Sequence, residues 1–177
     1  MVFLGGRLLS ERLSVGVMPL PSNLKILSAE RADARPILEL QREAYRSEAI
    51  LYEDWNIPPL IQTLPELEKE FEESVLLKAV LGDDIVGSVR ARAMDGIVHI
   101  GRLIVAPTVQ RRGIGGALLQ AIESVFPAAH GFDLFTGSRS EGNIRLYQRH
   151  GYAVTHEKVL SPKVTLVFMR KSKAPEA

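Results

Sequence analysis

The stretch VAPTVQRRGIGGALLQAIE, residues 105–123, decides how the chain is interpreted. It places Gly113, Gly115 and Gly116, all poor helix formers, where a helix is about to begin. Apolar residues then recur at helical spacing, so we expect a helix over about residues 113–125 that packs one face on the rest of the protein. The first turn of such a helix points unpaired backbone N–H groups outward, with the positive end of the helix dipole behind them.

This glycine-rich helix start predicts a binding site for an anion. A glycine has no Cβ, so a bulky anion is able to approach the N–H groups closely. Arg111 and Arg112 place positive charge at the same point, and together these features form a cradle suited to a pyrophosphate. A turn that only changes the chain direction is the structural alternative. The pattern does not fit a P-loop, because no Gly-Lys-Ser/Thr is present, and the dinucleotide-binding pattern lacks its final glycine.

The composition is that of an ordinary globular protein. The 177 residues are 46% hydrophobic and 24% charged, with a net charge of +1. This size is close to that of one domain, and the balanced charge gives no reason to expect a nucleic acid or a membrane as partner. The absence of cysteine excludes disulfides, thiolate metal sites and a cysteine nucleophile. The sequence contains no run of about 18 apolar residues, so no transmembrane helix is predicted.

The first part of the chain is expected to lie outside the folded domain. Residues 1–23 begin with an apolar patch that charged residues interrupt, so no signal peptide is expected, and Met18 is an alternative start. The folded domain is expected over residues 24–171, followed by a frayed tail at residues 172–177. The expected location is cytoplasmic.

Hydrophobic periodicity and turn residues predict an α/β (α+β) fold with a mixed sheet. The predicted order is β-α-α-β-β-β-α-β-α-β-β, which implies helices on the faces of the sheet. The stretch between the first two helices contains two consecutive prolines and is expected to be irregular. The predicted strands cover residues 24–29, 74–82, 84–96, 96–107, 131–137, 152–160 and 163–171. The predicted helices cover residues 32–50, 65–74, 113–125 and 141–151.

Two motifs resemble those of the GNAT N-acetyltransferase superfamily. LIVAPTVQRRGIGGALL, residues 103–119, is similar to motif A, whose pattern Gln/Arg-x-x-Gly-x-Gly/Ala falls here on Gln110, Gly113 and Gly115. EGNIRLYQRHGY, residues 141–152, is similar to motif B at the expected distance. The resemblance implies a mostly antiparallel, twisted sheet of about seven strands flanked by about four helices. It also implies that the protein is a transferase of the acyltransferase class, which uses acetyl-CoA as cosubstrate and needs no metal.

The resemblance implies how the chain would hold acetyl-CoA. In similar proteins the strand before the loop carries a bulge, and its backbone pairs with the pantetheine arm. That role would fall on the backbone of Leu103, Ile104 and Val105, whose side chains are expected in the core. The pyrophosphate would be held by the loop and the helix start, which are Gln110, Arg111, Arg112, Gly113, Ile114, Gly115, Gly116 and Ala117.

Asn143 and Tyr147 are four residues apart, hence on one helical face. The family places an Asn here to contact the cofactor arm and a Tyr to reach the sulfur of acetyl-CoA. A phenol, with a reference pKa near 10, is able to protonate a departing thiolate, so Tyr147 is the predicted general acid. The alternative is a tyrosine that only packs the helix, with Asn143 as the N-terminal cap.

His99 is the candidate general base. Many relatives carry an acidic residue at this position, and an imidazole is able to take a proton from an amine directly or through water. Strand alternation is expected to place His99 on the same face as Gly101, Leu103 and Val105, with Arg102 on the other face. The alternatives are a histidine hydrogen-bonded within the sheet, and an Arg102 that positions a substrate or is solvated.

Acceptor specificity in this family usually comes from the first helices and the loop after them. Tyr52, Glu53, Asp54 and Trp55 combine aromatic and acidic groups there, which suits a small cationic primary amine. The alternative is that the aromatic residues cap the core and the carboxylates form a solvated rim. A peptide acceptor, that is, a protein N-terminus or lysine, and a non-catalytic CoA-binding sensor both stay open. A homodimer is compatible with the sequence.

Overall fold

The computed structural model describes residues 19–173, so the first 18 residues of the expected extension and residues 174–177 of the tail lie outside the described residues. A seven-stranded sheet with the order β1-β2-β3-β4-β5-β7-β6 forms its centre. Neighbouring strands run antiparallel except β4 and β5, which are parallel. This confirms the predicted mixed, mostly antiparallel sheet. The strands are β1 (Leu24–Ser28), β2 (Val75–Leu81), β3 (Asp84–Met94), β4 (Ile97–Val105), β5 (Gly131–Gly137), β6 (Ala153–Val159) and β7 (Thr165–Ser172).

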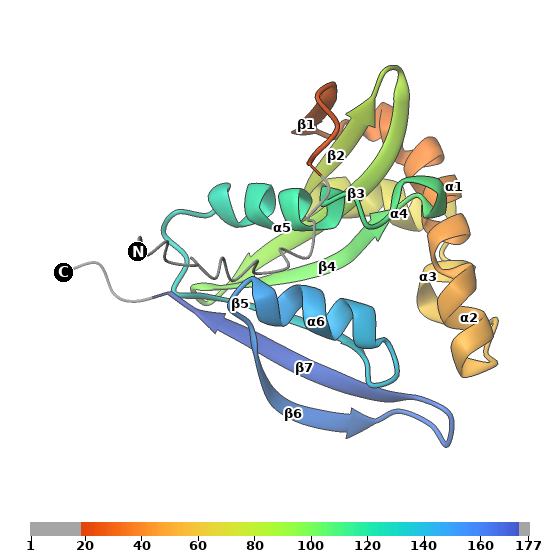
Figure 1. The fold of residues 1–177 in the computed structure, drawn as a ribbon, viewed down its shortest axis with the longest axis vertical. Helices are drawn as coiled ribbons and strands as arrows, with labels where there is room; N and C mark the ends of the chain where they lie inside the picture. The colour runs from red at the N-terminus through yellow and green to blue at the C-terminus, as the bar shows by residue number, and fades with distance from the viewer. Residues whose placement is uncertain (1–18, 174–177) are drawn as a thin grey trace, which may run out of the picture.

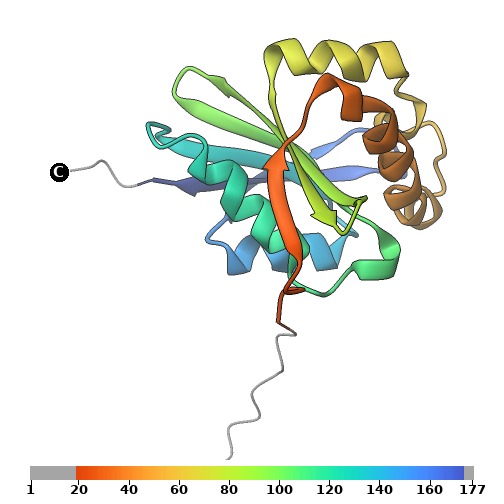
Figure 2. The same ribbon diagram turned by 90° about the horizontal axis from the view of Figure 1, so that it is seen from above.

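Helices lie on both faces of the sheet (Figures 1 and 2). The helices α1 and α4 cover one face, and α5 and α6 cover the other. None of the helices in the described part of the chain is both long and apolar enough to cross a membrane. The α-helices are α1 (Ala34–Ala44), α2 (Arg46–Tyr52), α3 (Pro58–Ile61), α4 (Leu64–Glu73), α5 (Ile114–Ser124) and α6 (Glu141–Arg149).

The helices before β2 differ in detail from the prediction. The helix expected over residues 32–50 is divided at Tyr45 into α1 and α2. Two prolines begin the one-turn helix α3 in a stretch expected to be irregular, because the fixed φ of proline suits a first helical turn. The next helix, α4, begins with a capping box in which Thr63 N–H donates to Glu66 Oε2 at 2.7 Å. The described chain therefore holds more helices than the four expected.

The main hydrophobic core lies between the sheet and α5. Leu118, Leu119 and Ile122 of α5 are fully buried, and burial of each such side chain contributes about 1.5–3 kcal/mol. Gly87 on β3 allows α5 to approach, because a Cβ there would lie 2.9 Å from Leu118 and 3.0 Å from the carbonyl oxygen of Ile104. This close packing holds the start of α5 at a fixed position beside β4.

A bulge interrupts β4 at Arg102. The φ angle of Arg102 is +48°, and the pairing with β3 shifts at this point. Gly101 lies opposite Arg90, whereas Ile104 lies opposite Ser88, so two residues of β4 face one residue of β3. An extra residue of this kind bends a strand and redirects its side chains. The bulge that the resemblance implies before the loop is therefore present.

The parallel strands β4 and β5 separate after a short pairing. Residues 97–99 pair with residues 131–133, and no further residues of the two strands pair. The edge of β4 from Ile100 to Val105 that faces β5 consequently has no neighbouring strand in the described chain. Unpaired backbone groups along such an edge are able to pair with an extended ligand. We refer to this gap between β4 and β5 as the opening.

The bulge reverses the alternation of side chains along β4, so the faces expected for a regular strand are wrong from the bulge onward. Before the bulge, His99 lies opposite Arg92, which forms an ion pair with α4 and so lies on the face that α1 and α4 cover. Arg102 faces α1 as well, instead of the opposite face. Val105 turns to the α5 face, where it lies near Gly115.

Candidate active site

The loop between β4 and α5 leaves a row of backbone N–H groups free. The chain leaves β4 through a short 3-10 turn, Pro107–Val109, and enters α5 at Gly113. The N–H of Ala117 donates to the carbonyl oxygen of Gly113 at 3.0 Å. Among residues 19–173, no acceptor lies within hydrogen-bonding distance of the N–H groups from Arg111 to Gly116. These groups coincide with the positive end of α5 and together form an anion cradle.

Side chains and backbone conformation hold this loop in place. Gln110 Nε2 donates to the carbonyl oxygen of Val105 at 3.1 Å and so ties the loop to the end of β4. Arg111 has a φ of +61°, a conformation that residues other than glycine rarely adopt. Neither Arg111 nor Arg112 forms an ion pair within the described residues, so the positive charge of both is free to act on an anion.

The three glycines of the loop have different roles. Gly113 has a φ of +80° and provides the left-handed entry to α5. A Cβ on Gly115 would lie 3.5 Å from Leu146, which is an ordinary contact. A Cβ on Gly116 would lie 2.9 Å from the ring of His150, so the absence of a side chain there allows α6 to pack on α5. Sequence reasoning assigned all three glycines to the approach of an anion, whereas the structure gives Gly116 a packing role.

Tyr147 of α6 is buried beside Tyr152. Its side chain is 7% exposed, and its ring centroid lies 6.0 Å from that of Tyr152. Burial raises the pKa of the Tyr147 phenol well above its usual value, and the neighbouring Tyr45 and Glu48 raise it further. Since Tyr45 and Glu48 come from the α1–α2 segment and α6 covers the other face, the phenol lies where the two faces meet. Tyr147 therefore keeps its proton at physiological pH, as a general acid must.

Asn143 lies one turn before Tyr147 on the same side of α6. Its Nδ2 donates to Oγ1 of Thr136 on β5 at 3.3 Å. Ser140 occupies the N-cap position of α6, so the alternative that Asn143 caps this helix is wrong. The exposed amide lies beside β5, where a ligand in the opening would meet it.

His99 belongs to the last residue pair before β4 and β5 separate. Its partner in β5 is Asp133, and its side chain is exposed at the closed end of the opening. The hydrogen-bonded ion pair with Arg170 lowers the pKa of Asp133, and the nearby His99 lowers it further. In the described part of the chain, the His99 ring makes no hydrogen bond. Across residues 19–173, no three His, Asp or Glu side chains come together as a metal site.

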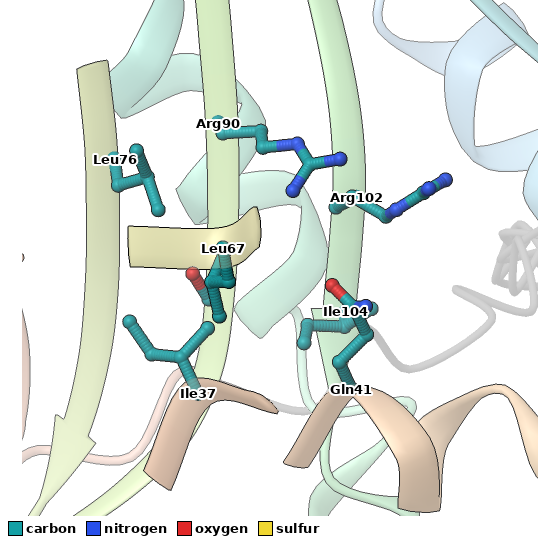
Figure 3. A pocket seen from close by; sticks show the side chains of 8 residues that line it. Ile37, Gln41, Leu67, Leu76, Arg90, Arg102 and Ile104 are labelled. Atoms are coloured by element: carbon teal, nitrogen blue, oxygen red, sulfur yellow. The ribbon is translucent and has the colours of Figure 1, made fainter. Parts of the chain in front are cut away.

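Sequence reasoning missed a polar cluster on the α1 side of the opening. The guanidinium of Arg102 lies over the ring of Tyr45, 5.9 Å from its centroid. Arg90 extends from β3 toward Arg102 (Figure 3), and it pairs with Glu70 of α4. Glu48 of α2 accepts a hydrogen bond from the β5–α6 loop at 2.6 Å. No sequence pattern signals this cluster, because its members come from four separate segments.

Two of the four residues predicted to hold the acceptor make contacts within the protein. Tyr52 is 4% exposed, and its hydroxyl accepts a hydrogen bond from the N–H of Arg139 at 2.8 Å. Asp54 Oδ1 accepts a hydrogen bond from the N–H of Asn56 at 2.9 Å. Both contacts fix the chain after α2.

The other two residues, Glu53 and Trp55, are exposed beyond the end of α2. Trp55 is 54% exposed and lines a shallow groove with Arg42 and Leu60. This groove shares no lining residue with the small cavity beside Arg102. The four residues therefore do not converge on one pocket, and their role in acceptor binding stays a prediction.

Replacing Gly137 with alanine is expected to break the contact of Tyr52 with the β5–α6 loop. A Cβ on Gly137 would lie 2.5 Å from Cζ of Tyr52, so the ring has to leave its place. We expect the free energy of unfolding, measured with denaturant, to fall by about 2–4 kcal/mol. Gly142→Ala is the matched control, since nothing lies within 4 Å of its Cβ position. Equal stability of the two variants would contradict the role of Tyr52.

Comparison with known families shows which family the chain belongs to. A family model described as the acetyltransferase (GNAT) family matches residues 34–152, which is more than half of the chain. The chain belongs to the GNAT acetyltransferase family. The matched residues include β4, the cradle loop, α5 and α6, so the candidate site lies inside the region that defines the family. The predicted family and the acyltransferase class are thereby confirmed.

Solved structures of several acetyltransferases share the fold of this GNAT protein. PaiA N-acetyltransferase from Thermoplasma acidophilum, in complex with coenzyme A, is 16% identical, with a TM-score of 0.69 over 85% of this chain and 99% of that chain. The ribosomal-protein-S18-alanine N-acetyltransferase from Escherichia coli is 15% identical, with a TM-score of 0.69 over 87% and 96%. A GNAT family acetyltransferase from Elizabethkingia anophelis with acetyl-CoA bound is 18% identical, with a TM-score of 0.65 over 86% and 100%. At these identities the likeness establishes the fold alone. Curated protein sequences give no match.

Proposed function

We propose that this GNAT acetyltransferase transfers the acetyl group of acetyl-CoA to the nitrogen of a primary amine. The observation that carries the proposal is the row of free N–H groups at the start of α5, next to the opening, together with the buried, protonated phenol of Tyr147. An anion cradle, an unpaired strand edge and a proton donor are the parts needed to hold a CoA thioester and to release CoA.

The residues of the loop fit the charged end of acetyl-CoA. The N–H groups from Arg111 to Gly116 and the charges of Arg111 and Arg112 would hold the pyrophosphate. The N–H of Ala117, which was also expected to bind it, donates to Gly113 instead. The free edge of β4 at residues 103–105 would pair with the pantetheine arm, which carries amide groups, and Asn143 of α6 would contact the same arm. When bound, acetyl-CoA supplies the activated acetyl group at the opening.

Tyr147 is the proposed general acid. The amine nitrogen forms a bond to the carbonyl carbon, the carbon–sulfur bond breaks, and the sulfur takes a proton while the amine loses one. The burial that raises the pKa of Tyr147 also disfavours a free thiolate at the same place, so proton transfer to sulfur stays favourable. Backbone N–H groups of the bulged strand would stabilise the negative charge on the carbonyl oxygen. The sequence contains no cysteine, which agrees with direct transfer.

His99 is the proposed proton acceptor, and Glu48 is the second candidate because its carboxylate lies near Tyr147. We expect His99→Gln to lower kcat/KM for an amine about 10- to 100-fold at neutral pH. The matched control is His130→Gln, which replaces an exposed histidine before β5. If Glu48→Gln lowers kcat/KM to this extent while His99→Gln leaves it unchanged, Glu48 is the base.

The proposed acceptor is a small primary amine, which reaches the site as a cationic ammonium. The test is the release of CoA thiol from acetyl-CoA with a panel of small amines and with peptides that carry a free N-terminus or a lysine. Release that depends on small amines supports the proposal, and release that depends only on peptides identifies a protein-modifying enzyme. Binding of acetyl-CoA without release by any amine or peptide identifies a CoA-binding sensor.

A further inference from the structure

Arg102 has a strained backbone conformation at the β4 bulge. Its φ of +48° lies in the left-handed region, which disfavours every residue except glycine and, to a lesser degree, asparagine and aspartate. Bulge residues in this conformation are typically glycines. A long, charged residue at this position, close to the proposed chemistry, is therefore a pointer to function.

The guanidinium of Arg102 is oriented but has no anionic partner. Its Nε is buried, and no acceptor in the described part of the chain bonds to it. Within residues 19–173, no carboxylate forms an ion pair with Arg102. The ring of Tyr45 supports the guanidinium through a cation–π contact. A guanidinium held in this way is able to bind a planar oxyanion through two parallel hydrogen bonds.

Arg90 adds a second positive charge beside Arg102. Its side chain is 17% exposed and extends toward Arg102 (Figure 3). Burial lowers the pKa of Arg90 to about 10, and the charge of Arg102 contributes to this shift. Glu70 pairs with Arg90, whereas Arg102 has no ion pair within the described residues. The charge of Arg102 is therefore left for an added anion to balance.

An anion bound at Arg102 would belong to the acceptor and not to CoA, because Arg102 and the cradle lie at different places. The cradle lies beyond the end of β4 at the start of α5, whereas Arg102 faces α1 from within β4. Tyr45, under the guanidinium, is close enough to the Tyr147 phenol to raise its pKa, and Glu48 acts on the same phenol. Tyr45 thus contacts Arg102 and also acts on the Tyr147 phenol, and Glu48 supplies a negative charge near the same phenol. This arrangement of a positive and a negative charge suits a zwitterion.

We propose that the acceptor carries an oxyanion, a carboxylate foremost, a few bonds from its amine, and that Arg102 binds this oxyanion. This inference rests on the proposed N-acetyltransferase function and narrows its acceptors from amines in general to small molecules of the amino acid type. The cavity between Arg90, Arg102 and α1 measures only about 10 Å3, room for about one water molecule. The acceptor therefore meets Arg102 from the opening and not from inside this cavity.

The experiment compares matched acceptors with acetyl-CoA as donor. Each α-, β- and γ-amino acid is paired with its amide and with the amine that lacks the carboxyl group, and aminoalkylphosphonates test a second oxyanion. We expect kcat/KM to be at least about 10-fold higher for the oxyanion-bearing member of the preferred pair. Arg102→Gln is expected to lower that value about 100-fold and to leave the turnover of acceptors without an oxyanion and the Kd of acetyl-CoA unchanged.

Three further variants separate recognition from structure. Arg102→Gly removes the side chain and relieves the left-handed φ, so we expect the same loss with carboxylate acceptors at a melting temperature no lower than that of the wild type. Arg102→Lys keeps the charge without the planar fork, and we expect its kcat/KM with carboxylate acceptors to lie between those of the wild type and Arg102→Gln. Arg92→Gln, on the same face and in an exposed ion pair with Glu73, is the matched control and is expected to keep the preference for carboxylates.

Two results overturn the proposal. One is equal or faster turnover of the amines that lack the carboxyl group, and the other is an Arg102→Gln variant that slows all acceptors alike. If acetyl-CoA binds and no amine is acetylated, the proposed function fails, and the oxyanion site is judged by calorimetry with N-acetylated amino acids and their amides. The site is supported if the acids bind more tightly than their amides and if Arg102→Gln abolishes this difference. Equal binding of acids and amides, or no binding of either, overturns it.

Discussion

Gly115→Glu is expected to abolish acetyl-CoA binding while the protein stays folded. A Cβ on Gly115 makes only ordinary contacts, so the first carbon of the new side chain fits. The remaining chain has to enter the cradle, where its carboxylate accepts hydrogen bonds from the free N–H groups and repels a pyrophosphate. We expect the Kd to rise at least about 100-fold, or about 2.7 kcal/mol. A carboxylate in the first turn suits the helix dipole, so the free energy of unfolding should change by less than about 1 kcal/mol.

Calorimetric titration with acetyl-CoA measures this effect, and two variants at the same position control it. Gly115→Ala adds only the carbon that fits, and we expect its Kd to stay within about fivefold of the wild type. Gly115→Gln adds the bulk without the charge, and we expect its Kd to lie between those of Gly115→Ala and Gly115→Glu. An unchanged Kd for Gly115→Glu in a folded protein would remove the cradle as the CoA site.

Tyr147→Phe is expected to lower kcat about 100- to 1000-fold, because a positioned general acid contributes about 10²–10⁴ to a rate. The Kd of acetyl-CoA should change by less than about threefold, since most of the proposed cofactor contacts come from other groups. Within the described residues, no hydrogen bond holds the Tyr147 hydroxyl, so its removal should cost no stability. The raised pKa also keeps the phenol protonated as pH rises, and we expect no loss of kcat from its ionisation below about pH 10.

Tyr152→Phe is the matched control for Tyr147→Phe. The rings of the two tyrosines pack on each other, but the Tyr152 hydroxyl donates to Glu123 Oε1 at 2.8 Å. Removing that hydroxyl is expected to cost about 1 kcal/mol of stability and to leave kcat unchanged. Equal kcat values for Tyr147→Phe and the wild type would exclude Tyr147 as the proton donor.

The cradle was predictable because its parts are contiguous in the chain. Glycines, arginines and the apolar face of α5 follow one another within residues 105–123, and free N–H groups arise at any helix start. The spacing of Asn143 and Tyr147 on α6 was readable for the same reason. The separate roles of the glycines were not readable, because the contact of Gly116 with His150 joins two helices.

The acceptor side was not predictable from local pattern. One extra residue at the bulge turns Arg102 toward α1, and the shifted pairing with β3 is visible only in the folded sheet. Tyr52 is of a residue type expected in a binding site, yet its hydroxyl accepts a hydrogen bond from the β5–α6 loop, which is distant in the sequence. Composition indicates what a side chain is able to do, whereas neighbours from other elements decide which partner it meets.

The sequence by itself determined the family, the order of the strands along the chain and the place of the anion cradle. Each of these depends on residues that are neighbours along the chain, through helical spacing, turn chemistry and backbone donors. The tertiary structure decided the opening between β4 and β5, the burial of Tyr147 and the charges around Arg102. Those properties arise where separate segments meet, since burial sets the pKa of a phenol and the sum of nearby charges sets which substrate a site attracts.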